Sequence, residues 1–218
     1  KELLPKYDLT REDIFITSKL GHGEMTSSDR VVRAYKRSLN HLGVEYLDLY
    51  LMSYPSASKQ NFDDVKNKSL RQKTWDALVD LYETAQVNAI GVSNFKINHI
   101  EDLLSKKHGV VPAVSQVLIY ILLIYLLQGY HPLGGVDGKD VLMNHPNLIK
   151  IAKDVGASPA QVLLVWALQK DVGVIPKATT QEHIKENNNL NFRLTSQQIK
   201  ILDEVDQQKF NWHPRDVS

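Results

Sequence analysis

Short apolar runs with the composition of β-strands alternate with segments of helical periodicity along this chain of 218 residues. The strand-like runs are rich in β-branched and aromatic residues and cover residues 13–20, 46–53, 89–94, 114–117, 126–130 and 172–175. Between most of them, apolar side chains recur at helical spacing, as Trp75, Leu78, Val79 and Tyr82 do. This alternation is typical of βα units on a parallel sheet, so the expected fold class is α/β.

The glycine pattern separates two arrangements of such units. No G-x-G-x-x-G sequence follows any of the six runs, although a dinucleotide-binding Rossmann domain would carry one after its first strand. A TIM (β/α)8 barrel is therefore the preferred arrangement. With 43% hydrophobic residues, the chain is expected to form a single domain over residues 1–218 with one sizeable core.

One connection is too short for this scheme. Only residues 118–125 separate the fourth and fifth runs, whereas a parallel crossover needs about a dozen residues or more. Residues 117–127 are all apolar or aromatic, and they are too few to span a membrane, which takes about 20 residues. A connecting helix is therefore expected to be missing, and the run is of the kind that aggregates when it is exposed.

Polar residues stand at or just after the ends of these runs. They are Lys19, Ser53, Ser93, Asn94, Gln116 and Lys177. The carboxyl ends of the strands build the active site of a TIM barrel, so polar residues from several strands indicate an enzyme. For any one of them alone, an ordinary solvated strand end is the alternative.

The segment after the last run has the pattern of a turn and a helix start. Thr179 and Glu182 fit a capping box, and the free N–H groups of that helix would lie beside Lys177. A helix N-terminus next to an ammonium is suited to an anion, above all a phosphate. An ordinary capped helix with a solvated lysine is the alternative.

Three other local sequence patterns indicate helix starts or a loop. Ser158 before Pro159 marks a helix start, and Thr195 with Gln198 forms a second expected capping box. Residues 67–69 match a glycosylation sequon but are expected to be part of a polar loop that precedes the next helix.

Composition bears on the class of partner. The formal net charge is +1 with both signs interspersed, which favours neither nucleic acid nor an anionic membrane and leaves a small molecule as the expected partner. The absence of cysteine excludes disulfides and thiolate metal sites, no metal site is expected, and the cytoplasm is the expected location. The first residues lack a methionine and an apolar signal core, so a fragment of a longer protein is expected.

Taken together, several motifs are recognisable in their order along the chain. They are LTREDIFITSK at 9–19, YLDLYL at 46–51, GVSNF at 91–95, YHPLG at 130–134, IPK at 175–177 and IKEN at 184–187. With these motifs the chain resembles the aldo-keto reductases, which are NADP(H)-dependent enzymes that reduce aldehydes and ketones to alcohols on a TIM barrel. The resemblance covers nearly the whole chain.

The resemblance implies a set of NADP(H)-binding residues. Ser93, Asn94 and Gln116 match the residues that hold the nicotinamide carboxamide, and Tyr130 matches the tyrosine that stacks on the nicotinamide ring. Lys177 matches the lysine that binds the 2′-phosphate, and Glu186 and Asn187 match the adenine contacts. His183 stands where many members have arginine, and Leu133 and Thr179 complete the set. Ala178 stands where serine is frequent, which weakens the expected preference for NADPH over NADH.

The resemblance also implies a depleted catalytic site. Chemistry in this family rests on an Asp, Tyr, Lys and His tetrad, in which the tyrosine protonates the carbonyl oxygen while hydride leaves the nicotinamide. Lys19 matches the lysine, but Ser53 replaces the histidine, and the Asp and Tyr belong to strands that would precede Lys1. Tyr54 replaces a tryptophan that is typical of the substrate pocket.

These features predict an incomplete barrel. About six strands are expected, with the first two strands and one later helix missing, so the strands around Ile16 and Val174 would be open edges that favour self-association. Carbonyl reductase activity of this chain is expected to be low or absent. The alternatives are a non-catalytic NADP(H)-binding or regulatory protein on the same scaffold and an unstable truncated product.

Overall fold

The computed structural model of the chain describes residues 3–57, 66–105, 109–117, 126–130, 132–133 and 140–205. The chain divides into two compact units, which are residues 1–115 with 215–218 and residues 116–214. We describe each unit by itself. The organisation as a single domain stays a prediction.

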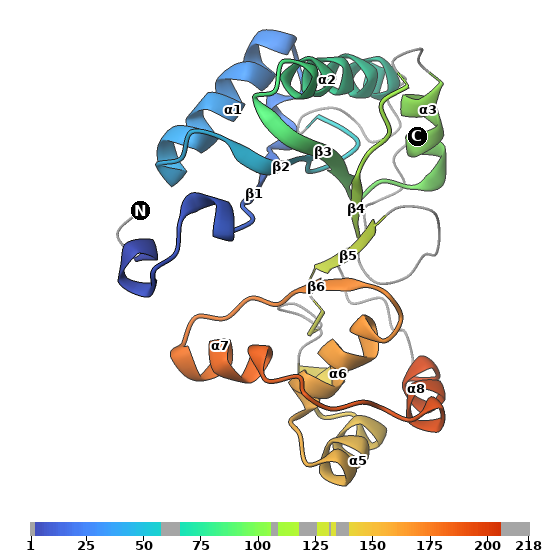
Figure 1. Ribbon diagram of the computed structural model, residues 1–218. Coiled ribbons are helices and arrows are strands. Elements are labelled where there is room, and N and C mark those ends of the chain that lie inside the picture. Colours follow the sequence, from blue (N-terminus) through green and yellow to red (C-terminus); the bar gives the residue numbers. More distant parts are fainter. Residues whose placement is uncertain are drawn as a thin grey trace. The chain divides into compact units, whose positions relative to one another are not determined.

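The first unit alternates strands with helices (Figure 1). Its elements are the 3-10 turns η1 (Leu4–Tyr7), η2 (Arg11–Asp13) and η3 (His22–Glu24), the strands β1 (Thr17–Leu20), β2 (Leu47–Met52) and β3 (Val87–Ser93), the helices α1 (Ser28–Leu42), α2 (Lys66–Glu83) and α3 (Ile97–Leu104), and the first two residues of β4 (Val114–Val117).

Strands β1, β2 and β3 pair in parallel in the order of the sequence. Lys19 lies opposite Leu51, and Leu51 lies opposite Gly91. Every residue of β2 is buried, as its nearly continuous apolar sequence predicts for a strand that is covered on both faces. Gly91 has a packing reason, because a Cβ there would collide with the backbone of Val114 on β4.

Helices α1 and α2 lie against one face of these strands (Figure 1). Their inward side chains form the core of the unit with those of the strands, and the largest fully buried ones include Tyr35, Tyr50, Leu20, Met52, Trp75 and Leu78. Gly43 ends α1 in the left-handed conformation with φ of 65°, as its position after the apolar stripe predicts.

Two sequence-based boundaries in this unit are wrong. The first strand was expected over 13–20, but β1 begins at Thr17, because Thr10 and Asp13 bond reciprocally and hold η2 as a 3-10 turn. Residues 67–69 were expected in a loop, but they lie in the first turn of α2. Asn67 and Arg71 are buried on this helix in line with Trp75, and these polar residues interrupt the apolar pattern from which the helix was read.

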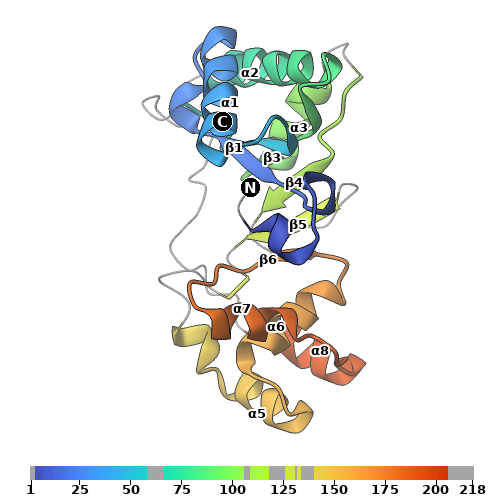
Figure 2. The same ribbon diagram turned by 60° about the vertical axis from the view of Figure 1, so that its left-hand side comes forward.

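The second unit contains the end of β4 and a further set of strands and helices (Figure 2). They are β5 (Leu126–Tyr130), α5 (Pro146–Val155), α6 (Pro159–Leu168), β6 (Gly173–Ile175), α7 (Gln181–Asn188) and α8 (Ser196–Asp203). Strand β5 pairs in parallel with β6, with Gln128 opposite Gly173. The core lies between α5, α6 and the segment that leads to α8, and it includes Leu148, Ile151, Val162, Leu163, Leu194 and Leu202.

Two of the three predicted helix starts in this unit are confirmed. The hydroxyl of Ser158 accepts from Gln161 N at 3.2 Å, and that of Thr195 accepts from Gln198 N at 3.2 Å, each within a complete capping box. The capping box expected at Thr179 is wrong. Thr180 has the extended backbone of an N-cap, and its hydroxyl accepts from His183 N at 3.2 Å, so α7 begins one residue later than expected.

Two further predictions concern the short connection at 118–125 and the open strand edges. The connection lies outside the residues that the structure describes. Within the described ranges, β1 of the first unit and β6 of the second each have one strand neighbour, in line with the expected open edges. Among the helices of those ranges, none is long and apolar enough to cross a membrane.

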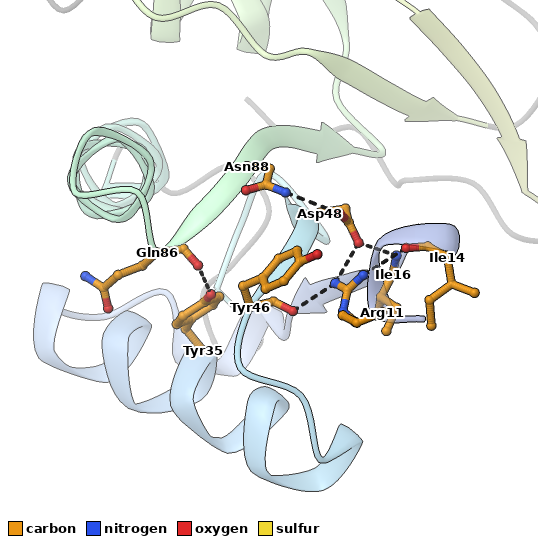
Figure 3. Close-up of polar contacts among 8 residues, drawn as sticks. All are labelled: Arg11, Ile14, Ile16, Tyr35, Tyr46, Asp48, Gln86 and Asn88. Atoms are coloured by element: carbon orange, nitrogen blue, oxygen red, sulfur yellow. Dashed lines mark hydrogen bonds and ion pairs between the residues drawn. The ribbon is translucent and has the colours of Figure 1, made fainter. Parts of the chain in front are cut away.

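A partly buried ion pair links the amino ends of the first three strands (Figure 3). The carboxylate of Asp48 on β2 accepts from Arg11 Nη2 at 2.7 Å, from Ile16 N at 2.8 Å and from Asn88 Nδ2 at 3.2 Å. Arg11 also donates to the carbonyl oxygen of Tyr46 at 3.0 Å, and its guanidinium lies 4.0 Å from the centre of the Tyr46 ring. One carboxylate thus links the segment before β1 to β2 and β3.

A second long-range bond lies beside this pair in Figure 3. The hydroxyl of Tyr35 on α1 donates to the carbonyl oxygen of Gln86, the residue before β3. The ring of Tyr35 packs edge-on against Tyr50 of β2, with ring centroids 5.3 Å apart. Helix α1 is therefore fixed to the same strand ends as the Asp48 network.

Replacing Asp48 with Asn should lower the free energy of unfolding by about 1 to 3 kcal/mol at pH 7, because the partly buried Arg11 loses its ionic partner. Desolvation alone would raise the pKa of Asp48, but the hydrogen bonds from Ile16 and Arg11 and the charge of Arg11 together lower it. The stability that this carboxylate contributes is present above its unfolded pKa of about 4 and is lost as the pH falls below that value. Urea unfolding at pH 7 and pH 3 should therefore show a difference from the parent chain that shrinks at pH 3.

Asp80→Asn is the matched control, because Asp80 is exposed on α2 and no partner of its carboxylate is recorded among the described residues. Its effect should stay within about 0.5 kcal/mol. An equal loss at both pH values for Asp48→Asn would show that the charge of Asp48 does not contribute.

The cap of α7 gives a second prediction. Thr180→Ala should destabilise the first turn of α7 by about 1 kcal/mol, because the His183 N–H loses its acceptor. Thr179→Ala removes the neighbouring hydroxyl, which does not cap the helix, and should leave that turn unchanged. Hydrogen exchange of the His183 amide measures both, and faster exchange in the Thr179 variant alone would contradict the assignment of the cap.

Candidate functional site

The predicted site residues of the first unit lie at the carboxyl ends of adjacent parallel strands. Lys19 is the third residue of β1, Ser53 follows β2 directly, and Ser93 ends β3. The backbone N–H of Ser53 donates to the carbonyl oxygen of Leu20 at 3.2 Å, which continues the pairing of β1 with β2 past the end of β2. The parallel register therefore brings these side chains to the same edge of the sheet.

Asn94 connects two of these positions. Its Nδ2 donates to the carbonyl oxygen of Ser53 at 2.8 Å and to the hydroxyl of Ser93 at 3.4 Å. The backbone of Asn94 is left-handed with φ of 65°, a conformation that asparagine tolerates better than most residues. A residue predicted from the cofactor motif thus holds the backbone of the residue at the predicted catalytic position.

The two predicted catalytic side chains have different surroundings. Desolvation by nearby protein atoms lowers the pKa of the Lys19 ammonium, although the side chain as a whole is exposed. The hydroxyl of Ser53 is buried, and no hydrogen-bond partner for it is found among the described residues. A serine hydroxyl has neither the reach nor the basicity of an imidazole, so Ser53 does not reproduce a histidine at this position.

The loop after β2 carries Tyr54, the predicted substrate-pocket residue. Its ring lies 6.1 Å from the ring of His22, at an interplanar angle of 55°. His22 was not predicted as a site residue. The available signal was its position between Gly21 and Gly23, just after the end of a predicted strand.

A buried arginine also holds the loop that follows β2. Arg71 on α2 is 1% exposed and donates to the carbonyl oxygen of Pro55 at 3.1 Å and to the Asp102 carboxylate at 2.8 Å. Lys68 approaches the same carboxylate at 2.6 Å. The Arg71 side chain therefore joins α2, α3 and the loop that carries Tyr54, a role that sequence patterns did not indicate.

In the second unit, the predicted nicotinamide residues Gln116 and Tyr130 lie on β4 and β5, and the predicted cofactor residue Leu133 follows β5. Gln116 of β4 is buried, and its Nε2 donates to Gln128 Oε1 of β5 at 2.7 Å. Tyr130 is the last residue of β5, but its side chain lies outside the described residues. Leu133 is half-buried and packs against the core of this unit.

The predicted phosphate and adenine residues lie on α7 and in the segment just before it. Lys177 lies between β6 and α7 with an exposed side chain, Thr179 and His183 are exposed, and Glu186 and Asn187 are half-buried in the last turn of the helix. This region thus presents an ammonium, a helix N-terminus and two partly covered polar side chains within one unit.

The N-terminus of α7 fits a phosphate. Thr180 satisfies the N–H of His183, but in the described part of the chain no acceptor is recorded for the N–H groups of Gln181 and Glu182. Free amides at a helix start, with a lysine just before them in sequence, are the donors that a phosphate group uses. No set of three or more His, Asp or Glu side chains in the described ranges is arranged to hold a metal ion.

Comparisons with known proteins agree with this arrangement. A sequence model of the Aldo/keto reductase family matches residues 1–127 and 140–207. The chain is 34% identical over 212 residues to the 9,11-endoperoxide prostaglandin H2 reductase of Trypanosoma cruzi (strain CL Brener), covering 91% of this chain and 70% of that protein. It is 30% identical over 246 residues to the glycerol 2-dehydrogenase (NADP(+)) of Saccharomyces cerevisiae (strain ATCC 204508 / S288c), covering 95% of this chain and 76% of that protein.

Solved structures show the same relation. The aldose reductase of Schistosoma japonicum superposes with a TM-score of 0.81 at 29% identity, covering 96% of this chain and 75% of that one. An aldo-keto reductase of Bombyx mori in complex with NADP superposes with a TM-score of 0.79 at 25% identity, covering all of this chain and 78% of that one. The chain therefore belongs to the aldo/keto reductase family of oxidoreductases and has the fold of an incomplete TIM barrel.

Proposed function

We propose that this chain binds NADP(H), with the 2′-phosphate of the adenosine held by Lys177 and the N-terminus of α7. The observation that carries the proposal is the pair of N–H groups at Gln181 and Glu182, which have no recorded acceptor among the described residues and follow an exposed lysine in sequence. The NADP named for a yeast relative and for a silkworm structure supports the same cofactor. A phosphate would meet a helix dipole and a full positive charge at this position.

The remaining cofactor contacts rest on the resemblance. Ser93, Asn94 and Gln116 are proposed for the nicotinamide carboxamide, and Tyr130 for stacking on the ring. Leu133, Thr179, His183, Glu186 and Asn187 complete the proposed contacts. The buried positions of Ser93 and Gln116 suit side chains that hold a fixed amide group rather than a solvated one.

The proposed reaction class is the reduction of a small carbonyl compound by NADPH, with low or absent turnover in this chain. Ser53 stands where the family has a histidine, and its buried hydroxyl has no partner among the described residues. A non-catalytic NADP(H)-binding role is the second candidate, and this same observation favours it. A cytoplasmic location and self-association through the open edges of β1 and β6 are further parts of the proposal.

Lys177→Met tests the phosphate assignment. The variant should bind NADPH about tenfold more weakly, because one charge-assisted contact to the 2′-phosphate is lost, while NADH affinity should stay nearly unchanged. Fluorescence titration measures both dissociation constants. Lys200→Met, an exposed lysine on α8, is the control and should change neither; an equal loss for NADPH and NADH in the Lys177 variant would contradict the assignment.

Turnover tests the catalytic part. NADPH oxidation with nitrobenzaldehyde should be about a hundredfold or more below that of the Schistosoma japonicum aldose reductase, because Ser53 cannot replace the histidine that assists proton transfer, and general acid catalysis usually supplies about 10² to 10⁴ in rate. Ser53→Ala should leave the residual rate within about twofold, because the hydroxyl has no hydrogen-bond partner among the described residues. A rate within about tenfold of the aldose reductase would refute the proposal, and a large loss in the alanine variant would make Ser53 catalytic.

A further inference from the structure

Helix α7 has no buried apolar side chain that would pack it against the rest of its unit. None of its residues is buried, and Ile184, its only large apolar side chain, is 58% exposed. Helices of eight residues are not stable on their own in water, so α7 needs contacts with the rest of the unit. Only its last turn contains partly buried residues, Glu186 and Asn187.

The contact that meets this need comes from Gln161 of α6, the helix against which α7 lies (Figure 2). The Gln161 side chain is 9% exposed, and its Nε2 donates to the carbonyl oxygen of Asn189 at 2.7 Å and to that of Glu186 at 3.2 Å. Glu186 lies in the last turn of α7, where its carbonyl also accepts from Asn189 N at 3.1 Å, and Asn189 is the residue after the helix. Gln161 therefore adds side-chain bonds from a different helix to the C-terminal end of α7.

The same side chain also holds its own helix. Gln161 Oε1 accepts from Ser158 N at 2.9 Å, which completes the capping box of α6. The carboxamide thus uses its acceptor on α6 and its donors on Glu186 of α7 and on Asn189, the residue after α7, so each end of the group has a separate task. This separation allows the two tasks to be tested independently.

Gln169, the residue directly after α6, makes a comparable pair of bonds in a different setting. Gln169 bonds to both backbone groups of Leu194, at 2.7 and 3.1 Å. The Leu194 side chain is itself buried in the core, so that stretch of chain has an apolar anchor as well. Within α7 no residue is buried, and the next apolar contact with the core is that of Leu190, two residues after the helix ends.

We propose that Gln161 is a positioning residue for NADP(H) binding: it fixes α7, and with it the helix N-terminus and the Glu186 and Asn187 side chains, in the orientation that receives the adenosine phosphate. The inference rests on the proposed function and extends it to a residue that does not touch the cofactor. Its loss should change the discrimination between NADPH and NADH rather than lower both affinities alike.

Gln161→Glu separates the two tasks of the side chain. A glutamate keeps an oxygen that accepts from Ser158 N, but it sets a carboxylate against two carbonyl oxygens in place of an amide donor. The matched control is Gln198→Glu, because Gln198 holds the same capping-box position on α8 and no contact of its Nε2 is recorded among the described residues. Both variants are made in the full chain.

Two measurements are made on each variant. We expect Gln161→Glu to bind NADPH about tenfold more weakly, to bind NADH less weakly than that because only the adenine contacts of Glu186 and Asn187 are disturbed, and to speed hydrogen exchange over residues 181–188 in the cofactor-free chain. The Gln198 control should change neither. Equal losses for NADPH and NADH, or unchanged exchange in α7, would overturn the positioning role.

The two proposals fail in different ways. If the parent chain does not bind NADPH, the proposed function fails and hydrogen exchange alone decides the inference: faster exchange in α7 supports the anchor, and unchanged exchange overturns it. If Gln161→Glu does not fold, Gln161→Met with Gln198→Met repeats the comparison without an added charge, and the same outcomes apply.

Discussion

Parallel pairing of β1, β2 and β3 is the constraint on which the candidate site of the first unit depends. Because the strands run in one direction, their carboxyl ends bring Ser53, Ser93 and Asn94 together, although these residues are up to 41 positions apart in the sequence. The opposite ends of the same strands carry the ion pair of Arg11 and Asp48. The amino ends of these strands thus carry the stabilising ion pair, and their carboxyl ends carry the polar residues of the candidate site.

Three polar side chains hold segments that carry or adjoin predicted site residues. Asn94 holds the backbone of Ser53, Arg71 holds that of Pro55, and Gln161 holds that of Asn189. Each uses an amide or guanidinium donor on a backbone carbonyl, which fixes a segment in position without covering its outward side chains. This explains how exposed segments such as α7 remain placed for ligands while burying almost no apolar surface.

Sequence patterns predicted what depends on neighbouring residues. The alternation of strands and helices, the caps at Ser158 and Thr195 and the location of polar residues at strand ends all followed from local spacing. The cap of α7 was placed on Thr179 instead of Thr180, because two adjacent threonines differ only in the backbone conformation that the fold imposes. Gln161 was missed for another reason: its partners lie 25 and 28 positions away, and no local pattern reveals them.

The N-terminus of α7 and Lys177 are proposed to recognise the 2′-phosphate of an adenosine nucleotide. Calorimetric titration of the chain with adenosine 2′,5′-bisphosphate and with adenosine 5′-monophosphate tests this proposal most directly, since the two ligands differ only in that phosphate. The bisphosphate should bind about tenfold more tightly or better, through one charge-assisted contact and the helix dipole. Equal affinity for the two ligands, or no binding of either, would contradict it.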